Sequence, residues 1–158
     1  MRVYVHVGTT GSVLVQELAE QLAASGVDTV DAPMTGGTPR ARAGTLTVMA
    51  SGPRPAFDYV TPLLETYSTK IVYLGAKPGI AQTMKLINNM VSAANLAVAA
   101  EAMVMGAKAG LDPELMLAVM NSGTAQNSAL LSKIPDHVLT RRFDYGSGIY
   151  VTEKDLTA

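Results

Sequence analysis

A long stretch without helix-breaking residues occupies the middle of the chain. From Gly79 to Ala109 there is no proline, Gly106 is the only internal glycine, and alanine and methionine are abundant, a composition that favours helix. About 30 residues at about 1.5 Å each would form a rod of roughly 45 Å. Because such a rod is longer than a small domain is wide, we expect more than one body of the protein to cover it.

The same stretch is apolar enough to raise the question of a membrane span. Between residues 86 and 110, however, it carries two charged and three amide side chains, namely Asn88, Asn89, Asn95, Glu101 and Lys108. A bilayer would not hold these groups cheaply. The N-terminal residues MRVYVHVGTT also lack the apolar run of a signal peptide. We therefore interpret the stretch as a buried helix of a soluble protein and expect no membrane partner.

Ahead of this helix, short β-branched runs alternate with a helical spacing of apolar residues. The expected elements are strands at residues 3–7, 28–33, 46–50 and 71–74 and helices at 12–24 and 56–67. A strand, helix and strand in succession make the first two strands parallel. The Gly-, Thr- and Arg-rich segment 34–44 is interpreted as a loop.

Residues after the long helix carry clear helix-start signals. Asp112 is placed as an N-cap and Pro113 at the first helical position. Helices are expected at 114–121 and 128–138, and the tail from residue 143 receives no predicted element. The fold class is therefore α/β, with a partial Rossmann-type sheet of about four strands, a long interdomain helix and an all-α segment. The corresponding parts are residues 1–76, 77–110 and 111–158.

Composition narrows the classes of function. The 158 residues carry a net charge of -1, no Lys/Arg run and only 5% aromatic residues, so we expect no nucleic-acid partner. The absence of cysteine excludes disulfides, thiolate zinc sites and a cysteine nucleophile. It also fits a reducing cytoplasm, the location we expect. No metal site is predicted.

The turn VHVGTTGS follows a strand and opens a helix, as a dinucleotide-binding turn does. Of the three glycines in such a fingerprint only Gly8 and Gly11 are present, and His6 stands where the first should be. A strand-to-helix turn needs glycine for its geometry in any case. We therefore favour an ordinary turn, and we assign structural roles to both His6 and His137.

Two other segments carry groups suited to chemistry. In DAPMTGG, the Thr35 hydroxyl and the N–H groups of Gly36 and Gly37 would form a concave set of donors for a carboxylate, although an ordinary Gly-rich turn has the same composition. In GIAQTMKLINN, Lys85 and Asn89 are four residues apart and so share a helix face. The alternative is a solvated pair on a surface helix.

The apolar neighbours of Lys85 favour the chemical interpretation. Partial desolvation lowers the pKa of an amine and favours a neutral form that can take a proton. The neighbours that would desolvate it are Met84, Ile87, Met90 and Val91.

These motifs occur in a specific order along nearly the whole chain. DAPMTGG with AGTLTVMASG, then GIAQTMKLINN, EAMVMGAKAGLDPELML and TEKDLTA, resemble the signatures of β-hydroxyacid dehydrogenases of the 3-hydroxyisobutyrate dehydrogenase and tartronate semialdehyde reductase type. The resemblance implies that Lys85 is catalytic. It also implies that Thr35, in place of the usual Ser, binds a substrate carboxylate with Gly36 and Gly37, and that Asn89 orients the substrate hydroxyl.

The resemblance further implies NAD or NADP as cofactor. Thr9 matches a threonine that contacts the cofactor in the family, and Lys154 of the KDL motif matches a lysine near it. The family's pyrophosphate-binding glycines precede the region that this chain matches, and family members continue with more helix after the KDL motif. We therefore expect a partial chain with weak or absent cofactor binding.

The expected function is that of a fragment of a 3-hydroxyacid dehydrogenase, which transfers hydride between NAD(P) and a small β-hydroxy acid or semialdehyde and is inactive alone. The alternative is a non-catalytic module that binds a small carboxylate or serves assembly. Either function would place Lys85 and the glycine pair at 36 and 37 on a common cleft. A sheet without its leading strands exposes an edge, and the long helix loses a covering layer, so we also expect a homodimer.

Overall fold

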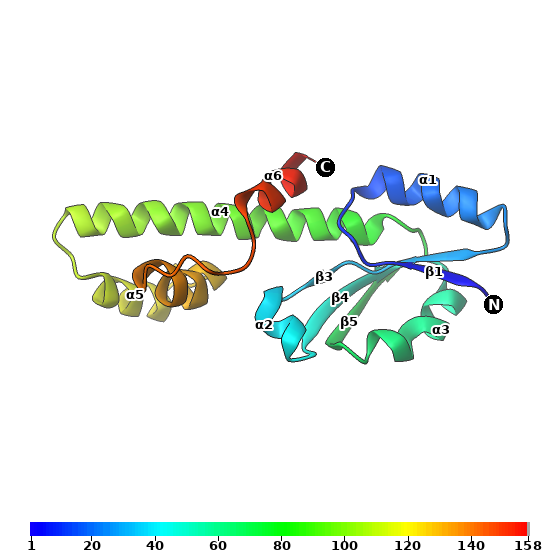
Figure 1. Cartoon of the computed structure of the whole chain (residues 1–158), viewed down its shortest axis with the longest axis horizontal. Helices are drawn as coiled ribbons and strands as arrows, with labels where there is room; N and C mark the ends of the chain where they lie inside the picture. Colours follow the sequence, from blue (N-terminus) through cyan, green and yellow to red (C-terminus); the bar gives the residue numbers. More distant parts are fainter. Residues whose placement is uncertain (158) are drawn as a thin grey trace. The chain divides into compact units, whose positions relative to one another are not determined.

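The computed structural model describes residues 1–157 (Figure 1). The chain forms two compact units. The first comprises Met1–Asn88 together with the residues from Lys154 onward, and the second comprises Asn89–Glu153. The α/β class predicted from the sequence is confirmed, with a sheet in the first unit and helices in the second.

The sheet of the first unit has five strands rather than about four. The central strand β4 pairs with β2 and β3 in antiparallel fashion and with β5 in parallel fashion, while β1 and β2 are parallel as predicted. The strand bounds are Val3–His6 (β1), Asp28–Asp31 (β2), Met34–Thr35 (β3), Leu46–Ser51 (β4) and Ser68–Gly75 (β5).

The segment predicted as a loop at 34–44 contains two of the elements that the sequence did not indicate. The short strand β3 pairs Met34 with Val48 and Thr35 with Thr47, and helix α2 (Gly37–Arg42) follows it. Strand propensity depends on cross-strand partners more than on the strand's own residues. A two-residue strand therefore leaves no local pattern, and the prediction of a plain loop was wrong.

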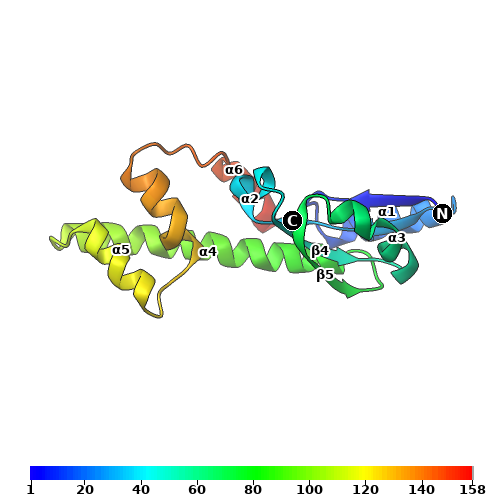
Figure 2. The same ribbon diagram turned by 90° about the horizontal axis from the view of Figure 1, so that it is seen from below.

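Helices α1 (Ser12–Ala23) and α3 (Arg54–Leu64) lie on opposite faces of the sheet (Figures 1 and 2). The buried face of α3 packs on the inner residues of β2 and β4, and the rings of Phe57 and Tyr73 lie 4.7 Å apart between centroids. On α1 only Val15 is fully buried. The core cluster consists of Val30, Ala32, Val48, Ala50, Ala56, Phe57, Val60 and Leu64.

The predicted long helix is present as α4 (Ile80–Lys108), which has 29 residues. Among the described residues it is the one helix long and apolar enough to cross a membrane by length and composition. Only 17% of its most apolar window is buried, so the expectation of a buried helix is wrong for this chain. In the second unit α4 buries Ala99 and Met103 against the neighbouring helices, which leaves much of its circumference exposed.

The second unit also contains α5 (Pro113–Ser122) and the π-helix η1 (Ala129–Leu139). The predicted N-cap is confirmed, because the Asp112 Oδ1 atom accepts hydrogen bonds from the Glu114 N–H at 2.9 Å and the Leu115 N–H at 3.0 Å. The helix expected at 128–138 is present but π-wound. Pro135 lies inside it and cannot donate to an α-helical ladder.

A last helix, α6 (Ile149–Thr157), occupies the tail for which no element was predicted. Its sequence opens with Ile149, Tyr150 and Val151, residue types that lower helix propensity. Asp155 near its end is only 8% exposed. That end of the helix belongs to the first unit, where Lys154 contacts Thr9, so tertiary contacts rather than local preference account for it.

Gly52 allows a close approach of backbone to backbone. It has a φ of 143°, and a Cβ atom there would lie 2.5 Å from the Thr29 carbonyl oxygen. We expect Gly52→Ala to lower the free energy of unfolding by about 3 kcal/mol, since it combines overpacking with backbone strain. Gly110→Ala is the control, because a Cβ atom there meets nothing within 4 Å, and it should cost about 1 kcal/mol. Urea unfolding measures both, and equal losses would contradict the close-approach argument.

Candidate active site

A buried carboxylate joins the sheet to the start of the long helix. Asp31, at the end of β2, is fully buried. Its Oδ2 atom accepts hydrogen bonds from the Gly79 N–H at 3.2 Å and the Gln82 N–H at 3.0 Å, and its Oδ1 atom accepts one from the Gln82 side-chain amide at 2.7 Å. The first N–H groups of a helix have no partners within the helix and favour an anion. Asp31 therefore fixes where α4 begins.

The Gln82 amide extends this network to the turn after β1. Gln82 is fully buried. Its Nε2 atom donates to the Gly8 carbonyl at 3.0 Å, and its Oε1 atom accepts from the Thr10 N–H at 3.0 Å. The Ser51 hydroxyl oxygen accepts from the Ala81 N–H at 3.1 Å. The ends of β1, β2 and β4 are thus bonded to the first turn of α4.

Two opposing effects act on the ionisation of Asp31. Burial raises the pKa of its carboxyl above the ordinary value of an aspartate. The hydrogen bonds from Gln82 and Gly79 and the nearby charge of His6 act in the other direction, but burial dominates. The donors around the carboxylate supply the partners that a buried acid needs.

Lys85 lies one helical turn after Gln82 and is partly buried. Burial lowers the pKa of its amine, which the charge of Asp155 counteracts and the charge of Lys154 reinforces. A lowered pKa increases the neutral fraction of the amine near neutral pH, which is the form that can accept a proton. The four apolar neighbours that the sequence offered as the source of this desolvation, Met84, Ile87, Met90 and Val91, are themselves 38–53% exposed.

The end of α6 brings the lysine of the KDL motif to the turn after β1. The Lys154 Nζ atom donates to the Thr9 carbonyl oxygen at 2.6 Å and lies 2.5 Å from the Asp155 Oδ1 atom. Thr9 and Lys154, which are far apart in the sequence and were both predicted on the cofactor side, are therefore in direct contact. The charge of Asp155, which contacts Lys154, in turn raises the pKa of Lys85.

The Gly-rich turn contacts the same helix one turn further along. The Asn88 Nδ2 atom lies 3.3 Å from the Thr35 Oγ1 atom, and Asn88 follows Lys85 by three residues, on the same face of α4. Gly36 has a φ of 137°, and a Cβ atom there would lie 2.9 Å from side-chain atoms of Arg40. The conformation of this turn therefore requires glycine at that position.

The remaining predicted residues are placed as follows. Gly37 is exposed and is the first residue of α2, next to Gly36 along the chain. Asn89 is the first residue of the second unit and is partly buried. Within residues 1–157 no cluster of three or more His, Cys, Asp or Glu residues could hold a metal ion.

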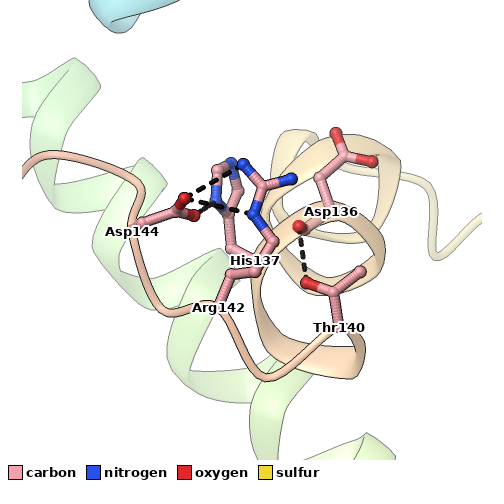
Figure 3. Close-up of polar contacts among 5 residues, drawn as sticks. All are labelled: Asp136, His137, Thr140, Arg142 and Asp144. Atoms are coloured by element: carbon pink, nitrogen blue, oxygen red, sulfur yellow. Dashed lines mark hydrogen bonds and ion pairs between the residues drawn. The ribbon is translucent and has the colours of Figure 1, made fainter.

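The two histidines anchor turns. His6 Nε2 lies 3.0 Å from the Thr10 hydroxyl. In the second unit, His137 Nδ1 lies 2.6 Å from Asp144 Oδ1, and Arg142 also contacts Asp144 (Figure 3). The hydrogen bond from His137 and then that from Arg142 lower the pKa of the exposed Asp144. These contacts tie the residues after η1 back to its last turn.

Two protein-family models together match nearly the whole chain. Residues 79–158 match a family described as NAD-binding of NADP-dependent 3-hydroxyisobutyrate dehydrogenase, and residues 2–75 match the NAD binding domain of 6-phosphogluconate dehydrogenase. The chain belongs to the 3-hydroxyisobutyrate dehydrogenase family.

Individual members of the family are clearly similar to this chain. L-threonate dehydrogenase of Escherichia coli O6:H1 is 35% identical over 148 residues, which are 94% of this chain and 49% of that protein. The crystal structure of 3-hydroxyisobutyrate dehydrogenase from Salmonella typhimurium superposes with a TM-score of 0.87 at 31% identity, over 98% of this chain and 54% of that one. Psf3 in complex with NADP+ and 2-OPP gives 0.91 at 29% identity, over 98% and 54%. The chain spans about half the length of the curated relatives it matches.

The polar residues that organise this family member's site were not selected from the sequence. Asp31 and Asp155 belong to the motifs DAP and KDL, and Asn88 is the first amide of the INN motif. Gln82 could have been selected from the sequence, because it is a polar residue inside an otherwise apolar stretch. A polar residue that is buried there needs hydrogen-bond partners. Which partners it has could not be read from the chain.

The two charges near Lys85 should shift its pKa in opposite directions. We expect Asp155→Asn to lower the pKa of the Lys85 amine further, because it removes the charge that favours the ammonium form. Lys154→Gln should raise it, because it removes a like charge. An NMR titration of the Lys85 side chain measures both shifts.

The control for that titration is Asp58→Asn on α3, which removes an exposed carboxylate paired with Arg54 at 2.8 Å. It should leave the Lys85 midpoint where it is. Shifts of the same sign in Asp155→Asn and Lys154→Gln would contradict the electrostatic arrangement.

Proposed function

We propose that this chain provides the substrate-binding and proton-transfer part of a dehydrogenase that interconverts a small β-hydroxy acid and a semialdehyde with NAD or NADP. One observation carries the proposal. Lys85, whose pKa burial lowers, lies one turn from Asn88, which contacts Thr35 of the Gly-rich turn. The names of the similar proteins, L-threonate dehydrogenase and 3-hydroxyisobutyrate dehydrogenase, support a hydroxy acid as substrate.

In this proposal each side chain has one task. The Thr35 hydroxyl and the N–H groups of Gly36 and Gly37 bind the substrate carboxylate. Asn89 orients the substrate hydroxyl. The Lys85 Nζ atom accepts the hydroxyl proton during oxidation and returns it during reduction. NAD(P), when bound, supplies the hydride acceptor or donor.

The cofactor side of the proposed site is Thr9 with Lys154. Their contact at the Thr9 carbonyl places a cation and a hydroxyl-bearing residue together, a donor set that suits one end of a phosphorylated cofactor. The chain contains no G-x-G-x-x-G motif, the usual source of pyrophosphate contacts. We therefore propose that the isolated chain binds NAD(P) weakly and that a complete dinucleotide site needs further protein.

Turnover tests this proposal in two steps. The isolated chain with NAD+ or NADP+ and 3-hydroxyisobutyrate or L-threonate should show no oxidation above background, because positioning of the cofactor supplies much of the rate. Grafting the chain onto the unmatched part of the Salmonella typhimurium enzyme should give an active chimera. In that chimera Lys85→Ala should lower kcat by about 10²–10⁴-fold.

Two outcomes would contradict the proposal. Turnover by the isolated chain that Lys85→Ala abolishes would show that the cofactor site is sufficient as it stands. An active chimera that is insensitive to Lys85→Ala would remove Lys85 from the chemistry.

A non-catalytic carboxylate-binding or assembly module is the second candidate, because Thr35, Gly36, Gly37, Lys85 and Asn89 could bind a small acid without catalysis. Calorimetry with 3-hydroxyisobutyrate, with and without NADPH, separates the two. Binding of the acid that does not depend on NADPH, together with an inactive chimera, would support the module.

We also propose that the chain forms a homodimer in the cytoplasm, the compartment that a chain without cysteine suits. In the second unit, α4 and α5 expose apolar side chains, and Ala100, Glu101, Val104, Met105 and Lys108 form an open, mostly apolar face of α4. Large exposed apolar patches on soluble proteins mark association surfaces. The most exposed apolar side chains of α4 and α5 in the second unit are those of Val98, Val104, Met105, Leu115 and Val119, which are 56–71% exposed.

Light scattering at micromolar concentration should report a dimer. Met105→Glu should shift the population toward monomer, because it places a charge in the apolar surface. The control is Thr124→Glu, at an exposed position in the turn between α5 and η1 and so outside both helices of this surface, and it should leave the dimer intact. A monodisperse monomer for the unmodified chain would rule out this surface as a self-association site.

A further inference from the structure

We propose that Gln82 is a positioning residue that holds the turn at residues 8–10 against the first turn of α4, so that the segments bearing Thr9 and Lys85 move as one body. The catalytic meaning of this coupling rests on the proposed function. The coupling itself rests only on the contacts of Gln82, which belong entirely to the first unit.

The amide of Gln82 has a single orientation that satisfies its neighbours. Its oxygen accepts from the Thr10 N–H, and its nitrogen donates to the Gly8 carbonyl and to the Asp31 carboxylate. A rotated amide would place its NH₂ group against the Thr10 N–H and its oxygen against two acceptors. Because the Gln82 side chain is fully buried, leaving its amide oxygen and nitrogen without these partners is costly.

The turn after β1 is held at each of three successive residues. Gln82 bonds to Gly8 and to Thr10, and Lys154 bonds to the Thr9 carbonyl between them. Release of the turn by loss of Gln82 would therefore also remove the acceptor that places Lys154. Through that lysine, Gln82 would affect the charges that surround the proton acceptor.

Capping of the helix start does not by itself explain this arrangement. Ser51 caps the same end of α4 through the Ala81 N–H and is equally buried. It is not bonded to the turn at residues 8–10. Ser51→Ala is therefore a matched control, because it loosens the helix start without releasing the turn.

Hydrogen exchange of the Thr10 amide tests the proposal in the isolated chain. In Gln82→Met the exchange rate of this amide, corrected for global stability, should rise about tenfold, which corresponds to the loss of one hydrogen bond. In Ser51→Ala it should stay the same. An unchanged rate in Gln82→Met, or an equal rise in both variants, would overturn the proposal.

Gln82→Asn serves as a second variant if Gln82→Met does not fold. It keeps the polar groups but is too short to reach both Asp31 and the turn, so the same rise is expected at Thr10. Protection equal to that of the unmodified chain would overturn the proposal.

A double-mutant cycle tests the link between Gln82 and the contact of Lys154 with Thr9. The effects of Gln82→Met and Lys154→Met on the unfolding constant should be coupled by about threefold or more. Ser51→Ala and Lys154→Met should be independent. Additive effects of Gln82→Met and Lys154→Met would contradict the link between Gln82 and the Thr9 contact.

These measurements need no ligand, so they can fail independently of the proposed function. If the Thr10 amide exchanges faster in Gln82→Met but the chimera is inactive, the coupling stands and the proposed function is rejected. A chimera whose kcat is equally reduced by Gln82→Met and Ser51→Ala would reject the positioning role and leave the function in place.

Discussion

The site depends on one buried interaction, the contact of the Asp31 carboxylate with the start of α4. Both oxygens of Asp31 accept hydrogen bonds from the first turn of the helix, so the end of β2 determines where that helix begins. Desolvation opposes a buried charge, while the aligned donors stabilise it. Since Lys85 and Asn88 follow at the next positions on the same face, their placement relative to the sheet follows from this contact.

The chemistry of the site depends on a balance of charge around Lys85. Burial favours the neutral amine, and Asp155 limits the effect by favouring the ammonium form. In the proposed reaction the Lys85 amine takes and returns a proton, and such a group works best when its pKa is near the working pH. The side chain that provides the counter-charge comes from α6, near the end of the chain, and reaches the site together with Lys154 through its bond to Thr9. Residues from both ends of the first unit's sequence therefore contribute to one electrostatic environment.

Membership in the 3-hydroxyisobutyrate dehydrogenase family explains the motifs but not the exposed apolar surface of this chain. The relatives are about twice as long, whereas much of α4 is uncovered here. An apolar helix with so little burial gains little hydrophobic stabilisation on its own. The proposed dimer would bury part of this apolar surface.

Features controlled by local chemistry could be predicted from the sequence. These are the long helix, which follows from the lack of helix-breaking residues, the Asp112 cap, the parallel β1–β2 pair and the motifs that identify the family. The tertiary structure alone decided β3, α2, α6 and the exposure of α4, because each depends on partners remote in the chain. The same is true in the site. The identities of Lys85, Thr35 and Gly36 came from motifs, but the bonding of Gln82 to Asp31 and of Asn88 to Thr35 came from contacts, since hydrogen-bond partners more than 40 residues apart leave no trace in local spacing.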